Sequence, residues 1–140
     1  MDITHDRERI RELLTEARTV AVVGDSPNPA RDAHRIAEYL IGAGYEVIPV
    51  NPQYSEVHGL RCFPTLQSIG RAVDIVDIFR RPENTPEVVE DAIAANAKCV
   101  WFQLDTANEA AAKRADEAGL ATVRNACTMV AHRTLRIPRR

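Results

Sequence analysis

An apolar run that ends in a glycine, followed by a polar turn and an amphipathic pattern, is the feature that most constrains this chain. Residues 20–24 read Val-Ala-Val-Val-Gly, and residues 25–29 read Asp-Ser-Pro-Asn-Pro. From Ala33 onward, apolar residues recur at helical spacing. This succession predicts a buried strand, a tight loop and a helix N-terminus. Such a loop offers backbone N–H groups and the positive end of a helix dipole to a phosphate.

The rest of the chain alternates between the same two patterns. Short apolar runs predict strands at residues 19–24, 45–50, 73–79, 99–104 and 120–124. Helical patterns precede the first strand at residues 5–17 and separate most of the others. Alternating strands and helices are typical of an α/β protein whose parallel sheet is covered by helices on both faces. We therefore expect a single Rossmann-like domain over residues 1–140, with a five-stranded parallel sheet in the order 3-2-1-4-5, counted along the chain.

Ligands of such sheets bind beyond the carboxyl ends of the strands, where the strand order reverses. In the expected order, this point lies between strands one and four. The loops after Gly24, Val50, Phe79, Gln103 and Arg124 are therefore the candidates for a binding site.

Local signals mark the ends of several elements. Thr4 is a plausible N-cap for the first helix, and Thr106 with Glu109 forms a capping box for a helix that closes at Gly119. Residues 53–64 are expected to be a loop or a short extended piece. The sequence predicts no particular secondary structure after the fifth strand. The basic tail at residues 133–140 is expected to be solvated and partly frayed.

Composition limits the classes of function. The 140 residues are 45% hydrophobic and 27% charged, as in a soluble globular domain, and the net charge of −2 gives no support to nucleic-acid binding. No apolar run is long enough to cross a membrane, and the acidic, polar N-terminus does not resemble a signal peptide. The three cysteines are far apart and form no C-x-x-C pair, which favours a reducing, cytoplasmic setting.

The loop after the first strand departs from the dinucleotide-binding pattern. Gly24 is not followed by the second and third glycines of G-x-G-x-x-G. Asn51 and Pro52 stand where an NAD-binding domain carries an acidic residue for the ribose. The chain also lacks the Gly-Lys-Ser or Gly-Lys-Thr of a P-loop. These departures weigh against a nicotinamide cofactor.

No catalytic constellation is evident. Ser26 lies outside any G-x-S-x-G elbow, and the four histidines are scattered along the sequence. His58 and Cys62 are four residues apart without a second ligand pair, so we expect no metal site. Cys127 follows the fifth strand, and a half-buried small side chain is a better reading of it than a reactive thiol. The chain therefore reads as a binding protein more than as an enzyme.

Groups suited to phosphates do occur at the strand ends. Arg31 begins the helix after the first loop, and Arg80 and Arg81 follow the third strand. A guanidinium fork matches a phosphate group well, although one of the latter pair could instead pair with Glu83.

Apolar surface for a base is available beside them. Asn51 and Pro52 could shape a flat slot for an adenine ring, next to apolar surface from Phe79. Trp101 alternates inside a buried strand and is expected to belong to the core.

Taken together, four segments resemble a known family. They are residues 22–31 (Val-Val-Gly-x-Ser-x-Asn-Pro-x-Arg), 44–52 (Gly-Tyr-x-Val-Ile-Pro-Val-Asn-Pro), 73–82 (Val-Asp-Ile-Val-Asp-Ile-Phe-Arg-Arg-Pro) and 100–104 (Val-Trp-Phe-Gln-Leu). In this order and spacing they resemble the small, stand-alone CoA-binding domain proteins, which are similar in fold to the CoA-binding domain of the succinyl-CoA synthetase alpha subunit. The resemblance covers residues 8–133.

The resemblance implies that coenzyme A, or an acyl-CoA, is held across the strand ends. The diphosphate would lie over residues 24–31 and the adenine near residues 50–52. The residues carried over as contacts are Gly24, Ser26, Pro27, Asn28, Arg31, Asn51, Pro52, Phe79, Arg80 and Arg81. The ligases of the wider group need further domains and a phosphorylated histidine, so the family implies binding, with a protein partner possible, without an established reaction.

Three positions in two segments depart from the family pattern. Asp105 stands where a glycine is usual, and Asn125-Ala126-Cys127 replaces a more usual Asp-Arg-Cys. The first change would bring a carboxylate toward an anionic ligand, and the second removes an arginine.

Two other functions stay open. One is an enzyme that uses NAD(P) or another nucleotide, which rests on the general fold alone. The other is a redox sensor in which Cys127 forms a mixed disulfide with the CoA thiol.

Overall fold

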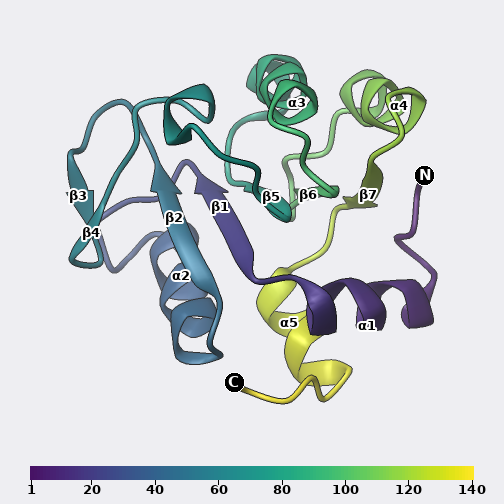
Figure 1. Cartoon of the computed structure of the whole chain (residues 1–140), viewed down its shortest axis with the longest axis horizontal. Coiled ribbons are helices and arrows are strands. Elements are labelled where there is room, and N and C mark those ends of the chain that lie inside the picture. The colour runs from purple at the N-terminus through teal and green to yellow at the C-terminus, as the bar shows by residue number, and fades with distance from the viewer.

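A five-stranded parallel sheet separates two layers of helices in the computed structural model, which describes residues 1–140 (Figure 1). The strands of the sheet are β1 (Thr19–Val23), β2 (Glu46–Val50), β5 (Ile75–Ile78), β6 (Cys99–Phe102) and β7 (Ala121–Arg124). One face packs against α1 (Arg7–Glu16), α2 (Asp32–Gly42) and α5 (Thr128–Thr134), and we call the hydrophobic cluster between them the first core. The other face packs against α3 (Thr85–Ala94) and α4 (Glu109–Glu117). The expected single α/β domain with a five-stranded parallel sheet is confirmed.

The strand order differs from the expected one. The sheet runs β2-β1-β5-β6-β7, which is 2-1-3-4-5 when these five strands are counted along the chain. The expected order 3-2-1-4-5 is therefore wrong, because β5 pairs with β1 and not with β2. The point where the order reverses lies between β1 and β5, so the loops after Gly24 and Phe79 become direct neighbours.

Pro49 explains why β2 lies at the edge. A proline has no N–H to donate to a neighbouring strand, so it is confined to edge strands and bulges. In β2 it pairs with Val22 of β1 on one side, while its carbonyl accepts a hydrogen bond from the Phe63 N–H at 3.0 Å on the other. The order 3-2-1-4-5 would have placed this proline in an interior strand.

The connection from β2 to β5 contains no α-helix. It holds the two-stranded hairpin β3 (Glu56–Val57) and β4 (Leu60–Arg61), followed by the 3₁₀ turn η1 (Gln67–Ile69). A second 3₁₀ turn, η2 (Pro82–Asn84), leads into α3. The hairpin lies beside β2 and α2 at one side of the molecule (Figure 1).

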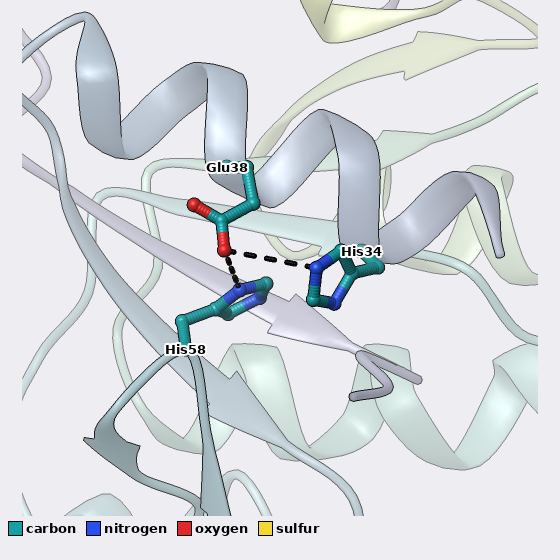
Figure 2. A group of neighbouring side chains, drawn as sticks. All are labelled: His34, Glu38 and His58. Atoms are coloured by element: carbon teal, nitrogen blue, oxygen red, sulfur yellow. Dashed lines mark hydrogen bonds and ion pairs between the residues drawn. The ribbon is translucent and has the colours of Figure 1, made fainter. Parts of the chain in front are cut away.

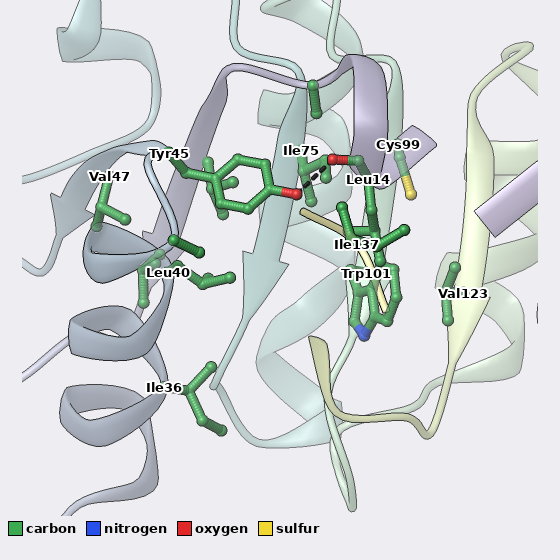
Figure 3. Close-up of a cluster of buried hydrophobic side chains, with 14 of the residues drawn as sticks. Leu14, Ile36, Leu40, Tyr45, Val47, Ile75, Cys99, Trp101, Val123 and Ile137 are labelled. Atoms are coloured by element: carbon green, nitrogen blue, oxygen red, sulfur yellow. Dashed lines mark hydrogen bonds between the residues drawn. The ribbon is translucent and has the colours of Figure 1, made fainter. Parts of the chain in front are cut away.

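The sheet is buried on both faces because nearly every strand residue is apolar. Successive residues of β1 serve opposite cores: Val22 packs on the α2 side and Val23 on the α3 side. Trp101 is fully buried, as expected, and its indole N–H donates to the Ala126 carbonyl at 2.9 Å. Figure 3 shows Trp101 among the aliphatic side chains of the first core, where the Tyr45 hydroxyl donates to a carbonyl of α1.

Two expected helix caps are replaced by neighbours. Asp6, not Thr4, caps α1 by accepting from the Arg9 N–H at 3.1 Å. Asn108, not Thr106, caps α4 by accepting from the N–H of Ala111 at 3.1 Å. The hydroxyl of Thr106 instead donates to the Gln103 carbonyl, which fastens the chain at the end of β6.

The C-terminal segment is ordered and packed against the body of the protein. After α5, Leu135 and Ile137 are buried in the first core, and the Arg140 N–H donates to the Ala43 carbonyl at 2.9 Å. The Arg140 guanidinium lies 4.9 Å from the centre of the Tyr45 ring. The four arginines of the basic tail are exposed, as expected for a solvated segment, but the tail is not frayed, because Leu135 and Ile137 are buried and its end lies against the end of α2. None of the helices combines the length and apolar character needed to cross a membrane.

Candidate functional site

A polar cleft opens at the carboxyl ends of β1, β2 and β5, where the strand order reverses. Its cavity volume is about 320 Å³. Of the predicted site residues, it is lined by Gly24, Ser26, Arg31, Asn51 and Phe79. We call it the loop cleft, because the segment 24–31 forms one of its walls. Its position agrees with the general rule for ligand sites in doubly wound sheets.

Gly24 allows the chain to leave β1 at this cleft. Its φ angle is +95°, in the left-handed region that favours glycine. A β-carbon at this position would lie 2.7 Å from the Phe79 carbonyl oxygen, which is too close for any real contact. The pairing of β1 with β5 thus makes a glycine necessary here, through both backbone conformation and space.

The loop after Gly24 is held by its own side chains. The Ser26 hydroxyl oxygen accepts from the Asn28 N–H at 3.1 Å, and the Asn28 side-chain oxygen accepts from the Ala30 N–H at 3.0 Å. From β2, the Asn51 amide donates to the Asp25 carbonyl at 2.8 Å. These polar side chains therefore fix the shape of the loop, which presents a preformed backbone to the cleft.

The N-terminus of α2 faces the same cleft without a cap. Arg31 occupies the N-cap position, with φ −84° and ψ 138°, and no side chain bonds to the first helical N–H groups. Asp32 and Ala33 line the cleft next to it, so the positive end of the helix dipole points there. The Asp32 carboxylate forms an ion pair with Arg35. The result is a partial positive charge suited to an anion.

The three predicted arginines are free to meet a ligand. The ion pairs of the structure use none of Arg31, Arg80 and Arg81, and the pairing with Glu83 considered from the sequence is not formed. Arg31 and Arg81 are exposed, and Arg80 is half-buried.

A second cleft lies on the α3 side of the same strand ends. Its cavity volume is about 190 Å³, and Val23, Val50, Pro52, Pro64 and Arg80 are among its lining residues. We call it the proline cleft. The predicted site residues are thus divided: five line the loop cleft, Pro52 and Arg80 line the proline cleft, and Pro27, Asn28 and Arg81 line neither.

The structure brings together side chains that the sequence reading kept apart. His34 and His58 were expected to be scattered, but their ring centres are 4.6 Å apart. His34 and Glu38 are four residues apart on α2, a spacing that puts both on one helix face and could have been noticed. His58 arrives from the turn between β3 and β4, and no pattern in the sequence predicted that contact (Figure 2).

Asp25 lies behind the loop and was also missed. Its carboxylate is fully buried and accepts from the Ser26 N–H at 2.8 Å and from His58 Nε2 at 2.8 Å. Burial raises the pKa of this carboxyl, although the neighbouring His58 opposes the rise. The carboxylate thus holds the loop and the hairpin together from the inside.

Asp77, Gln103 and Thr128 form a buried polar cluster near the carboxyl ends of β5 and β6. Asp77 of β5 is fully buried and accepts from the Gln103 amide at 2.6 Å and from the Thr128 hydroxyl at 2.9 Å. Burial raises the pKa of Asp77 to about 7, against the lowering effect of these two hydrogen bonds. The cluster ties the start of α5 to the ends of β5 and β6. Asp77 interrupts an otherwise apolar strand, a signal that the sequence reading passed over.

Two of the residues that depart from the family pattern, Asp105 and Asn125, share an uncommon backbone conformation and contact each other. Asp105 has φ +66° and Asn125 has φ +57°, so both adopt the left-handed conformation in which glycine is usual. The Asn125 side chain accepts from the Asp105 N–H at 3.0 Å. Asp105 is exposed, and like Cys127, which is half-buried at the N-cap of α5, it lines neither cleft.

Comparisons with known proteins support the fold. The uncharacterized protein YneT of Bacillus subtilis is 36% identical over 126 residues, which cover 90% of this chain and 93% of that protein. A solved structure of a hypothetical protein from Pyrococcus horikoshii OT3 is 47% identical, with a TM-score of 0.92 and coverage of 96% of each chain. An ADP-forming acetate–CoA ligase of Archaeoglobus fulgidus is 32% identical over 80 residues, which are 57% of this chain but 12% of that much longer protein.

A family model described as "CoA binding domain" matches residues 18–133, a range that includes all five strands, both clefts and the loop after Gly24. The chain belongs to the CoA-binding domain family.

Proposed function

We propose that this protein binds coenzyme A or an acyl-CoA at the carboxyl ends of β1, β2 and β5, as a binding or regulatory module without a reaction of its own. One observation carries the proposal. At one edge of the sheet, two arginines without carboxylate partners line two clefts: Arg31 lines the loop cleft, together with the glycine loop and the uncapped N-terminus of α2, and Arg80 lines the proline cleft. Membership of the CoA-binding domain family supports CoA as the anionic ligand of such a site.

The two clefts suit different parts of the ligand. The loop cleft offers Arg31, the N-terminus of α2 and the backbone after Gly24, which match the diphosphate. The proline cleft offers Val50, Pro52 and Pro64, whose flat and apolar surfaces match an adenine ring. Arg80 lines the proline cleft and is the candidate partner for the 3′-phosphate that distinguishes CoA from dephospho-CoA.

The roles of the remaining predicted contacts follow from where they lie. Asn51 and Ser26 line the loop cleft and also hold the loop, so they would act mainly by positioning its backbone. Arg81 is exposed beside the clefts and would contribute a general attraction for the phosphates. Phe79 would give apolar contact to the ligand from the end of β5.

Isothermal titration calorimetry with CoA, dephospho-CoA and pantetheine tests the proposal. We expect CoA to bind more tightly than dephospho-CoA, and pantetheine to bind weakly because it lacks the nucleotide phosphates. Arg31→Ala should weaken CoA and dephospho-CoA alike, by about tenfold or more, since a hydrogen bond to a charged group contributes about 1.5–3 kcal/mol. Arg80→Ala should weaken CoA by a similar factor and leave dephospho-CoA almost unchanged.

Arg71→Ala is the matched control. Arg71 is exposed and pairs with Glu46 at the start of β2, at the opposite end of the sheet, so its loss should not change CoA affinity. Absence of heat with CoA for a protein shown to be folded would refute the proposal. Tight binding of NAD or NADP in preference to CoA would favour a nucleotide-dependent enzyme instead.

A further inference from the structure

A group of metal-ligating side chains contacts the loop of the proposed CoA site but lines neither of its clefts. It consists of His34 and Glu38 on α2 and His58 in the turn between β3 and β4 (Figure 2). One potential ligand atom from each residue lies within 4.8 Å of the other two. The histidine side chains are 17% and 1% exposed and that of Glu38 is 52% exposed, so the group opens to solvent on the glutamate side.

Each histidine has one ring nitrogen already held in place. His34 Nδ1 lies 2.7 Å from the Ser26 carbonyl oxygen, and because a carbonyl only accepts, this nitrogen carries the proton. His58 Nε2 lies 2.8 Å from the buried Asp25 carboxylate, to which it donates. A histidine that ligates a metal almost always donates its other N–H to a carbonyl or a carboxylate in this way. Both outer partners of a metal site are therefore present.

The two remaining nitrogens converge on the same carboxylate. Glu38 Oε1 lies 2.9 Å from His58 Nδ1 and 3.7 Å from His34 Nε2 (Figure 2). Ligand atoms about 2.0–2.1 Å from a tetrahedral Zn²⁺ lie about 3.3 Å from one another, so small side-chain movements, some inward and some outward, would bring these atoms to that spacing.

The turn that carries His58 is an unusual place for this residue. His58 and Gly59 have φ angles of +59° and +72°, so together they form a two-residue hairpin turn of the type that prefers asparagine and glycine. Histidine is less favourable than asparagine in this left-handed conformation, but at this position its ring contacts Asp25 and Glu38.

We infer that His34 Nε2, His58 Nδ1 and the Glu38 carboxylate form a binding site for a divalent transition-metal ion, with Zn²⁺ as the natural probe. Two imidazoles and one carboxylate suit Zn²⁺, Ni²⁺ or Cu²⁺, whereas Mg²⁺ and Ca²⁺ prefer oxygen ligands alone. Three protein ligands leave a fourth position for water on the exposed side. The bound ion would fasten the β3–β4 hairpin to α2 and, through Asp25 and Ser26, to the loop of the CoA site.

The competing explanation needs no metal. A doubly protonated His58 between the Asp25 and Glu38 carboxylates would account for its two contacts as ion pairs. This explanation does not account for the 3.7 Å distance between His34 Nε2 and Glu38, because a neutral His34 ring carries its proton on Nδ1 and has none on Nε2. The two explanations give opposite results in a metal titration.

The test is a calorimetric titration of the full chain, stripped with a chelator and free of CoA, with Zn²⁺. We expect one ion per chain and a higher thermal-unfolding temperature when the ion is bound. His58→Asn, His34→Gln and Glu38→Gln should each weaken binding by more than about tenfold. His58→Asn is the most informative, because asparagine accepts the left-handed turn conformation and the hairpin should remain folded.

His5→Ala is the matched control, since His5 is exposed and lies outside the group. The affinity of His5→Ala for Zn²⁺ should equal that of the wild type. Replacing Zn²⁺ with Co²⁺ should give the visible absorption of a tetrahedral ion, and His58→Asn should abolish it. No binding by the wild type, or equal binding by the wild type and by folded His58→Asn, would overturn the inference. Because CoA is absent, neither result depends on the proposed function.

Discussion

The buried carboxyl of Asp77 should contribute a free energy of unfolding that falls as the pH rises, which is opposite in direction to the contribution of a carboxyl with a lowered pKa such as Asp74. The pKa of this group is raised from 3.8 to about 7 by burial, so the folded state holds its proton where the unfolded state has lost it. Its contribution is therefore fully present below pH 3.8 and is lost as the pH rises to about 7. The difference of about three pH units, at about 1.4 kcal/mol each, gives a total of about 4 kcal/mol.

Asp77→Asn isolates this effect. Asparagine has the size of the neutral acid, can accept from the Gln103 amide and can donate to the Thr128 hydroxyl, but it cannot ionise. About 2–3 kcal/mol of the effect falls between pH 5 and pH 8 when the two pKa values are inserted in the linkage relation. The free energy of unfolding of the variant should therefore rise by that amount, relative to the wild type, between those two pH values.

Urea unfolding followed by the fluorescence of Trp101 measures the difference, because this only tryptophan is fully buried. Asp74→Asn is the control with a lowered pKa: burial tends to raise it, but the N–H groups of Arg18 and Thr19 outweigh that effect. The stabilisation that ionised Asp74 provides is complete above pH 3.8 and is lost only below it. The difference in the free energy of unfolding between Asp74→Asn and the wild type should therefore not change between pH 5 and pH 8. A constant gap for Asp77→Asn, or one that favours the wild type at the higher pH, would refute the reasoning.

Two further substitutions test how the loop is built. Gly24→Ala should destabilise the protein by about 3 kcal/mol or more, since it combines left-handed strain with the 2.7 Å approach to the Phe79 carbonyl. Gly70→Ala, which has φ +74° and open space, should lose only about 1–2 kcal/mol in the same urea titration; equal losses would contradict the steric argument. Asn51→Ala removes the hydrogen bond to the Asp25 carbonyl and should cost about 1 kcal/mol of stability and also weaken CoA in calorimetry, whereas an unchanged CoA affinity would show that the loop needs no such support.

Much of the fold could be predicted because its signals are local. The five apolar runs gave strands close to those observed, and the glycine at the end of the first run indicated the turn that opens the loop cleft. The order of the strands could not be read from the same signals, since periodicity says nothing about which strand lies beside which. Pro49 held the missing information: a residue without an N–H in the middle of a strand argues for an edge position.

The candidate site was predictable to the same degree. Arg31, at the start of α2, and Phe79, just after β5, line the loop cleft as expected, because both follow strands whose carboxyl ends meet at one edge of the sheet. The approach of His58 to His34 depends on how a short hairpin folds back over α2, and no sequence period encodes that. Asp77 was visible as a charge in an apolar strand, but its partners became known only with the register of β5 and β6.

The helix-free passage from β2 to β5 has a consequence for the motions of the protein. Residues 51–72 bury few side chains, chiefly those of Val57, His58, Cys62 and Leu66, and their backbone hydrogen bonds are mostly local. Such a segment opens at a lower free energy than the sheet does, as a subglobal unit whose amide hydrogens exchange with solvent while the five strands remain protected. Because the segment supplies walls to both clefts, its opening and closing would set the rate at which a ligand enters and leaves. The absence of a helix between β2 and β5 would therefore make residues 51–72 the part of the site that opens for a ligand.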